Sequence, residues 1–155
     1  NEKRLALGKK YGADICVNPK EQDLYQIVQE ETNNKGVDIC CEASGAERAY
    51  QACFDLAKKN GKLIFYGIPR DSHTTRFDVT AVITRQLNLY GTSGAPWAWE
   101  PVLKLYGQGK YNIKEMVTHT FELNQIEEAI KTLNDPASGA VKIVLYSSNN
   151  QKTGE

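Results

Sequence analysis

The chain has 155 residues, of which 41% are hydrophobic and 25% charged, so it is long enough for one globular domain with a buried core. Its 19 Lys and Arg residues balance its 19 Asp and Glu residues, so the chain has no net positive charge. This argues against partners that are attracted by positive charge, such as nucleic acid or an anionic membrane surface. No apolar run approaches the ~20 residues of a membrane-spanning helix.

The predicted elements alternate between helices, where apolar residues recur at helical spacing, and strands, where short apolar runs precede small residues. In chain order they are a helix at 2–11, a strand at 14–17, a helix from 18 to about 34, a strand at 37–42, a helix at 46–59, a strand at 62–66, a helix or extended piece at 77–84, a strand at 87–91, a helix at 97–106, a strand at 117–122, a helix at 125–133 and a strand at 141–146. The second helix is expected to begin at Asn18 as its cap, with Pro19 in the first turn and Glu21 three residues on. The strand at 37–42 is apolar enough for burial on both faces.

Turns of small residues follow three of these strands, at 43–45, 67–69 and 91–94. Alternating strands and helices indicate a parallel sheet, and right-handed crossovers place the carboxyl ends of its strands at one edge. Open parallel sheets bind ligands at that edge. The pattern therefore predicts an α/β fold with a partial, doubly wound parallel sheet and a ligand site formed by the three turns. A Gly-x-Gly-x-x-Gly phosphate loop is missing, and the chain opens without Met, so we expect a sheet truncated at its N-terminus.

The four cysteines are interpreted as reduced thiols of a cytoplasmic protein, because Cys16, Cys40, Cys41 and Cys53 show no metal-ligand spacing and mostly lie in apolar patterns. His119 is interpreted as a structural histidine in a strand. The sequence therefore predicts no metal site in this chain.

Several stretches, taken in order, resemble the zinc-containing medium-chain dehydrogenases, in particular their sorbitol and threonine dehydrogenase branch. These stretches are GKKYGADICVNPKE, GVDICCEASGAERAYQACFDLAKKNGKLIFYGIP, QLNLYG, VTHTFELNQIEEAIKTL and SGAVKIVL. The resemblance implies a partial NAD(P)-binding Rossmann domain at 1–115, a segment at 116–146 that returns to a catalytic domain, and a polar tail at 147–155. The catalytic residues and the ligands of both zinc ions would belong to parts that this chain lacks.

The resemblance also implies contacts with NAD or NADP, and the choice between the two cofactors stays open. The implied contact residues are Arg4, Ala43, Ser44, Gly45, Gly67, Ile68, Asn88, Tyr90 and Lys142. Arg4 would border the adenosine, where an Arg could also hold a 2′-phosphate, and Lys142 would reach the pyrophosphate. Plainer interpretations stay open beside these: a solvated arginine, ordinary turns at the strand ends, and a lysine on an edge strand.

The function implied by the resemblance is the cofactor-binding part of a zinc-dependent oxidoreductase that transfers hydride from a secondary alcohol or polyol to NAD(P). The alcohol and the zinc would be bound by the absent domain, so the chain alone is expected to be inactive. The alternative is a non-catalytic nucleotide-binding or dimerisation module. A homodimer or homotetramer is expected to form through residues 73–91.

Overall fold

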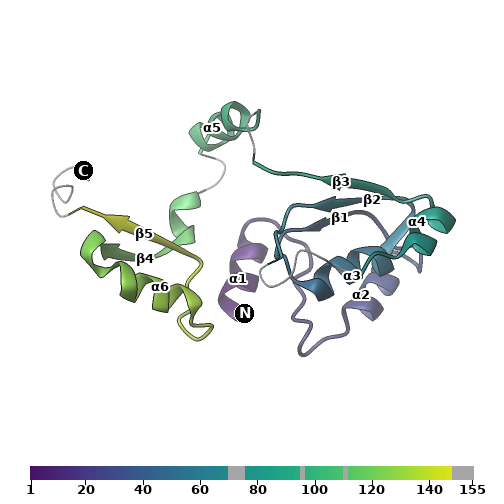
Figure 1. Ribbon diagram of the computed structural model, residues 1–155, viewed down its shortest axis with the longest axis horizontal. Helices are drawn as coiled ribbons and strands as arrows, with labels where there is room; N and C mark the ends of the chain where they lie inside the picture. Colours follow the sequence, from purple (N-terminus) through teal and green to yellow (C-terminus); the bar gives the residue numbers. More distant parts are fainter. Residues whose placement is uncertain (70–75, 95–96, 110–111, 148–155) are drawn as a thin grey trace. The chain divides into compact units, whose positions relative to one another are not determined.

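The computed structural model describes residues 1–69, 76–94, 97–109 and 112–147 (Figure 1). The chain divides into two compact units. We call Pro19–Pro96 the sheet unit, and Asn1–Asn18 together with Trp97–Glu155 the terminal unit. The domain division predicted near residue 115 stays a prediction.

The sheet unit contains a three-stranded parallel sheet in the order β1-β2-β3, which confirms the predicted α/β class and parallel pairing. Its elements are α2 (Leu24–Glu31), β1 (Val37–Glu42), α3 (Glu47–Leu56), β2 (Ala57–Phe65), α4 (Val79–Arg85) and β3 (Asn88–Gly91). The core lies where α3 and α4 pack on the sheet (Figure 1). Phe54 of α3 and Leu63 of β2 are its largest fully buried side chains.

Burial of β1 on both faces, as predicted, is wrong within the sheet unit. Cys40 and Glu42 are buried, whereas Ile39 is 55% exposed and Cys41 is also exposed. Successive residues of a strand face opposite sides, and the core of this unit covers only the Cys40 side.

The second helix starts five residues later than predicted. Its cap is Asp23, whose carboxylate accepts hydrogen bonds from Tyr25 N at 2.9 Å and Gln26 N at 3.1 Å. Asn18 does not cap a helix, because the residues that follow it form turns. Both are good capping residues, so only the path of the chain after residue 18 decides between them.

Two strand predictions also need correction. Residues 14–17 form no strand and pair with no strand among the described residues, and an apolar run becomes a strand only when it finds a partner. β2 begins at Ala57, opposite Val37, and the next aligned pair is Ile39 with Lys62. The helix predicted to reach residue 59 ends at Leu56, because Ala57 is already extended and joins β2, and the intervening bulge contains Asn60 in the left-handed region at φ 60°.

The terminal unit is a second α/β piece, with a two-stranded sheet. Its elements are α1 (Glu2–Lys10), α5 (Trp99–Gly107), the 3₁₀ turn η1 (Ile113–Met116), β4 (Val117–Glu122), the 3₁₀ turn η2 (Leu123–Gln125), α6 (Ile126–Asn134) and β5 (Lys142–Tyr146). β4 and β5 pair in parallel with α6 between them in the chain, as the sequence predicts. No helix within the described ranges is long and apolar enough to cross a membrane.

Candidate functional site

The three strands of the sheet unit end side by side. Glu42 at the end of β1 aligns with Phe65 of β2, which aligns with Gly91 of β3. Past these residues, Gly67 N donates to Glu42 O at 3.0 Å, and Thr92 N donates to Phe65 O at 3.1 Å. The alignment of the turns at one edge is therefore confirmed; we call it the carboxyl edge.

A buried carboxylate shapes the first turn of the carboxyl edge. Glu42 is 2% exposed, and its Oε1 accepts hydrogen bonds from Ser44 N at 2.7 Å, Ser44 Oγ at 2.5 Å and Gly45 N at 2.9 Å. Three donors on one carboxylate oxygen hold the turn in one conformation. Sequence reasoning did not assign this role to Glu42, although an acidic residue ending an apolar strand just before Ala-Ser-Gly is a visible signal.

The second oxygen of the same carboxylate is less well satisfied than the first. Glu42 Oε2 is buried and accepts no hydrogen bond from the described residues. The Tyr50 hydroxyl lies close to this carboxylate and donates a hydrogen bond to Gly67 O. Burial first, and then the charge of Glu42 and the closeness of its carboxylate to the hydroxyl, raise the pKa of Tyr50 above its usual value, so Tyr50 stays protonated. A buried acceptor is costly to leave without a donor, and the Tyr50 hydroxyl is the donor group beside this carboxylate.

Both predicted site glycines are needed for contact between the first two turns. Gly45 has φ +73°, and a Cβ there would lie 2.2 Å from Ile68 O. A Cβ on Gly67 would lie 2.2 Å from Gly45 N and 2.3 Å from Glu42 Oε2. The backbones of the two turns therefore touch directly. Cofactor contact by these glycines stays a prediction.

The other predicted residues of the sheet unit lie in different positions. Ala43 and Ser44 are exposed at the carboxyl edge, and Ile68 beside them is 79% exposed. Tyr90 pairs with Ile64 and is 49% exposed. Asn88 begins β3 opposite Lys62, so the strand register places it away from the carboxyl edge.

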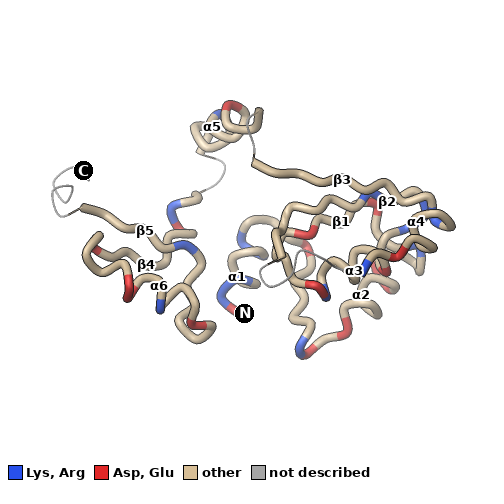
Figure 2. Tube along the Cα trace, viewed as in Figure 1, with Lys and Arg blue, Asp and Glu red and all other residues tan. Residues whose placement is uncertain are grey.

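Arg4 and Lys142 belong to the terminal unit, where the structure brings basic residues together. Arg4 Nη2 donates to Ala140 O at 2.9 Å, which ties α1 to the loop just before Lys142. The Lys3 side chain covers Gly139, where a Cβ would lie 2.6 Å from Lys3 Nζ. Figure 2 marks the basic residues of α1 in blue. Sequence reasoning missed Lys3, because its contact with Gly139 spans most of the chain.

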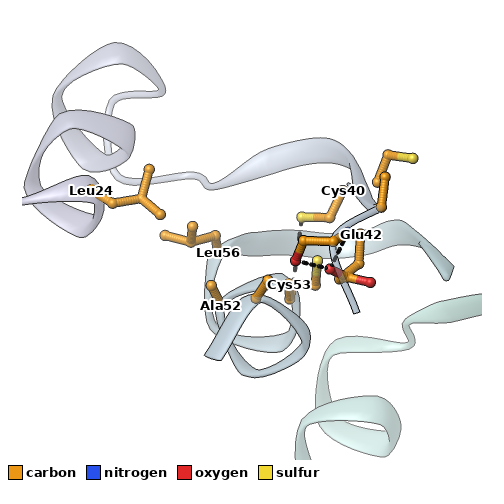
Figure 3. A pocket seen from close by; sticks show the side chains of 10 residues that line it. Leu24, Cys40, Glu42, Ala52, Cys53 and Leu56 are labelled. Carbon is orange, nitrogen blue, oxygen red and sulfur yellow. Dashed lines mark hydrogen bonds between the residues drawn. The ribbon is translucent and has the colours of Figure 1, made fainter. Parts of the chain in front are cut away.

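A cleft of about 480 Å³ lies behind the first turn, between β1, α3 and α2 (Figure 3). Its lining is mainly apolar and includes three thiols and the Glu42 carboxylate. The lining residues are Leu24, Cys40, Cys41, Glu42, Ala43, Ser44, Ala49, Ala52, Cys53 and Leu56. In the part of the chain that the structure describes, no group of three His, Cys, Asp or Glu residues is arranged to hold a metal ion.

A parallel sheet with small-residue turns at its carboxyl edge is the architecture of dinucleotide-binding domains. Residues 1–107 match the sequence model of the zinc-binding dehydrogenases. The chain is 33% identical over 146 residues to D-arabitol-phosphate dehydrogenase of Enterococcus avium, covering 94% of this chain and 41% of that protein. It is 32% identical to L-threonine 3-dehydrogenase of Symbiobacterium thermophilum, covering 93% of this chain and 42% of the relative.

Solved structures agree with this assignment. Benzyl alcohol dehydrogenase from Acinetobacter calcoaceticus superposes with a TM-score of 0.81 at 26% identity, covering 96% of this chain and 41% of that one. The chain belongs to the zinc-binding dehydrogenase family. It spans about two fifths of the length of the curated relatives it matches.

Proposed function

We propose that this chain is the cofactor-binding part of a zinc-dependent oxidoreductase that moves hydride from a secondary alcohol or polyol to NAD or NADP. The observation that carries the proposal is the carboxyl edge, with its first turn held by Glu42, in a chain of the zinc-binding dehydrogenase family. The relatives named for arabitol phosphate and threonine support an alcohol-bearing substrate.

The residues of the carboxyl edge fit a nicotinamide nucleotide. The exposed Ile68 offers an apolar surface for a flat ring. Ala43 and Ser44 leave room for close approach to the backbone. We assign Ile68 and the backbone after Gly67 to the nicotinamide end, where the bound ring would accept the hydride.

The basic residues of the terminal unit are proposed as phosphate ligands. Arg4 uses one donor on Ala140 O, and the guanidinium carries four further N–H donors. Lys142 is exposed at the start of β5, with its ammonium group accessible. The residues that bind zinc and the alcohol would lie in a longer protein, and the cytoplasmic location likewise stays a prediction.

The alternative is a dimerisation module without catalysis. Residues 73–75 of the predicted contact lie outside the described residues, but 76–91 include α4 and β3. In this stretch Phe77 is 52% exposed and Ile83 is 69% exposed, and β3 pairs on one side only among the described strands. An open strand edge beside exposed apolar side chains favours pairing with a second copy.

Backbone NMR of the labelled chain tests the cofactor proposal. NADH should shift the amide signals of Ser44, Gly45 and Ile68, whereas AMP, which lacks nicotinamide, should leave Ile68 unchanged. An Ile68→Asp variant should lose the response to NADH, and Ile83→Asp on α4 is the matched exposed control. If NADH shifts no signal at the carboxyl edge while light scattering finds a defined dimer, the dimerisation module is the better account.

A further inference from the structure

We propose that Cys40 and Cys53 are a peroxide-sensitive thiol pair, which forms a disulfide between β1 and α3 behind the first turn of the carboxyl edge. This modification site is independent of the proposed function. It rests on the position of the two thiols and on the cleft that reaches them.

The two cysteines contact each other across the strand–helix interface. Cys40 Sγ donates a hydrogen bond to Cys53 O at 3.6 Å, as Figure 3 shows. Their exposed fractions are 9% and 8%, so packing holds both side chains in place. Both cysteines also line the same cleft, so the two side chains border one space.

The cleft gives a small oxidant access to these buried groups. Cys40 and Cys53 both line the volume of about 480 Å³, which is ample for hydrogen peroxide. Cys41 lines it too, but as the next residue of the strand it faces the opposite side of the sheet from Cys40. Geometry therefore selects Cys40 as the partner of Cys53.

The environment also gives the two thiols different acidities. A hydrogen bond from the Cys53 thiol, opposed by burial and aided by the charge of Arg85, lowers the pKa of Cys40 from its usual value. The same hydrogen bond, followed by burial, raises the pKa of Cys53. Cys40 therefore loses its thiol proton more readily than Cys53, and its thiolate is the first nucleophile.

The proposed reaction balances with one peroxide. The Cys40 thiolate attacks one peroxide oxygen and breaks the O–O bond, which leaves a sulfenic acid on Cys40 and a hydroxide that takes up a proton. The sulfur of Cys53 then attacks the sulfenic sulfur, forming the S–S bond and releasing a second water. The two thiols lose two electrons and two protons, and the peroxide is reduced to two waters. The new bond would close the loop that contains residues 43–45.

Peptide mapping of the unmodified chain tests the proposal directly. The chain is treated with hydrogen peroxide, its free thiols are blocked with an alkylating reagent, and it is digested with trypsin without reduction. The expected product is a disulfide joining the tryptic peptides 36–48 and 49–58, which disappears on reduction. Recovery of both peptides alkylated at every cysteine, under peroxide that oxidises free cysteine, would overturn the proposal.

Single variants assign the bond, since Cys40 and Cys41 share one tryptic peptide. Cys41→Ser should keep the linked pair, whereas Cys40→Ser and Cys53→Ser should lose it, with circular dichroism confirming that each variant folds. Cys16→Ser, in the terminal unit, is a further control that should also keep it. A linked pair that survives Cys40→Ser and vanishes in Cys41→Ser would show that the chosen partner is wrong.

Discussion

The sheet unit and the terminal unit differ in how they bury apolar surface. The core cluster lies entirely in the sheet unit, where α3 and α4 pack on β1 and β2. In the terminal unit the buried apolar residues are Ala129 and Ala140 among those described, and α5 buries none. Trp99 and Leu103 on α5 are 67% and 61% exposed. A helix this apolar is normally covered, so the terminal unit is the one whose stability depends on further contacts.

The largest expected effect comes from truncating the centre of the sheet unit. Phe54 is 1% exposed, and its ring centroid lies 5.9 Å from that of Phe65 and 5.5 Å from that of Phe77. Phe54→Ala should lower the free energy of unfolding by about 3–5 kcal/mol, measured by urea denaturation with circular dichroism. Leu103→Ala on α5 should change it by less than about 0.5 kcal/mol. Equal losses of unfolding free energy in the two variants would contradict the conclusion that the sheet unit alone has a well-packed apolar core.

The next effect concerns the basic residues of the terminal unit. In the longer enzyme that we propose, Lys142→Ala should raise the Michaelis constant for the dinucleotide, with a smaller effect on turnover, because the lost contact would stabilise ground and transition states alike. The expected scale is about 1.5–3 kcal/mol, that of a hydrogen bond to a charged group. Lys131→Ala on α6 is the control. An unchanged constant would make Lys142 a surface lysine of an edge strand.

The contact between the two turns can be broken with a single methyl group. Gly67→Ala places a Cβ against Gly45 N, so it should cost roughly 1–3 kcal/mol of unfolding free energy through backbone displacement. Gly91→Ala adds the same group at the end of β3, where nothing lies within 4 Å. Urea denaturation measures the free energy of unfolding of both variants, and so compares an added methyl group in a crowded position with one in open space at the same edge. A harmless Gly67→Ala would mean that the turns separate easily.

The smallest effect is electrostatic and belongs to the terminal unit. A hydrogen bond from Lys10, opposed by slight burial and aided by its charge, holds the pKa of Glu115 below its usual value. Because the folded pKa is the lower one, this stabilisation is present above the usual Glu value and is lost as pH falls through the folded pKa. Both side chains are exposed, so salt should weaken it.

Hydrogen exchange of the α1 amides checks this last prediction. Exchange corrected for its intrinsic pH dependence should speed up as the Lys10–Glu115 pair is lost in acid, while β2 amides stay protected. Glu115→Gln should abolish the pH dependence in α1, and Glu127→Gln on α6 should preserve it. A pH profile unaffected by Glu115→Gln would show that the pair does not hold α1.

Local patterns in the sequence were enough for the class of fold and for the carboxyl edge. Apolar periodicity and glycine-bearing turns act over a few residues, so the parallel α/β order, the bounds of β4 and the alignment of three turns could be predicted. The family motifs are local as well. They led to the zinc-binding dehydrogenases, which the comparisons confirm.

Only the tertiary structure decided the features that depend on a distant partner. Residues 14–17 have the composition of a strand but pair with no strand among the described residues. β1 is covered by helices on one face, and the sequence of β1 does not indicate which face that is. The hydrogen bond from Arg4 to Ala140 joins residues 136 positions apart, so no local pattern announces it. Glu42 holds the first turn because folding buries its carboxylate beside the amides of Ser44 and Gly45, which donate hydrogen bonds to it. A carboxylate removed from water must find such donors nearby, and only the packed chain supplies them.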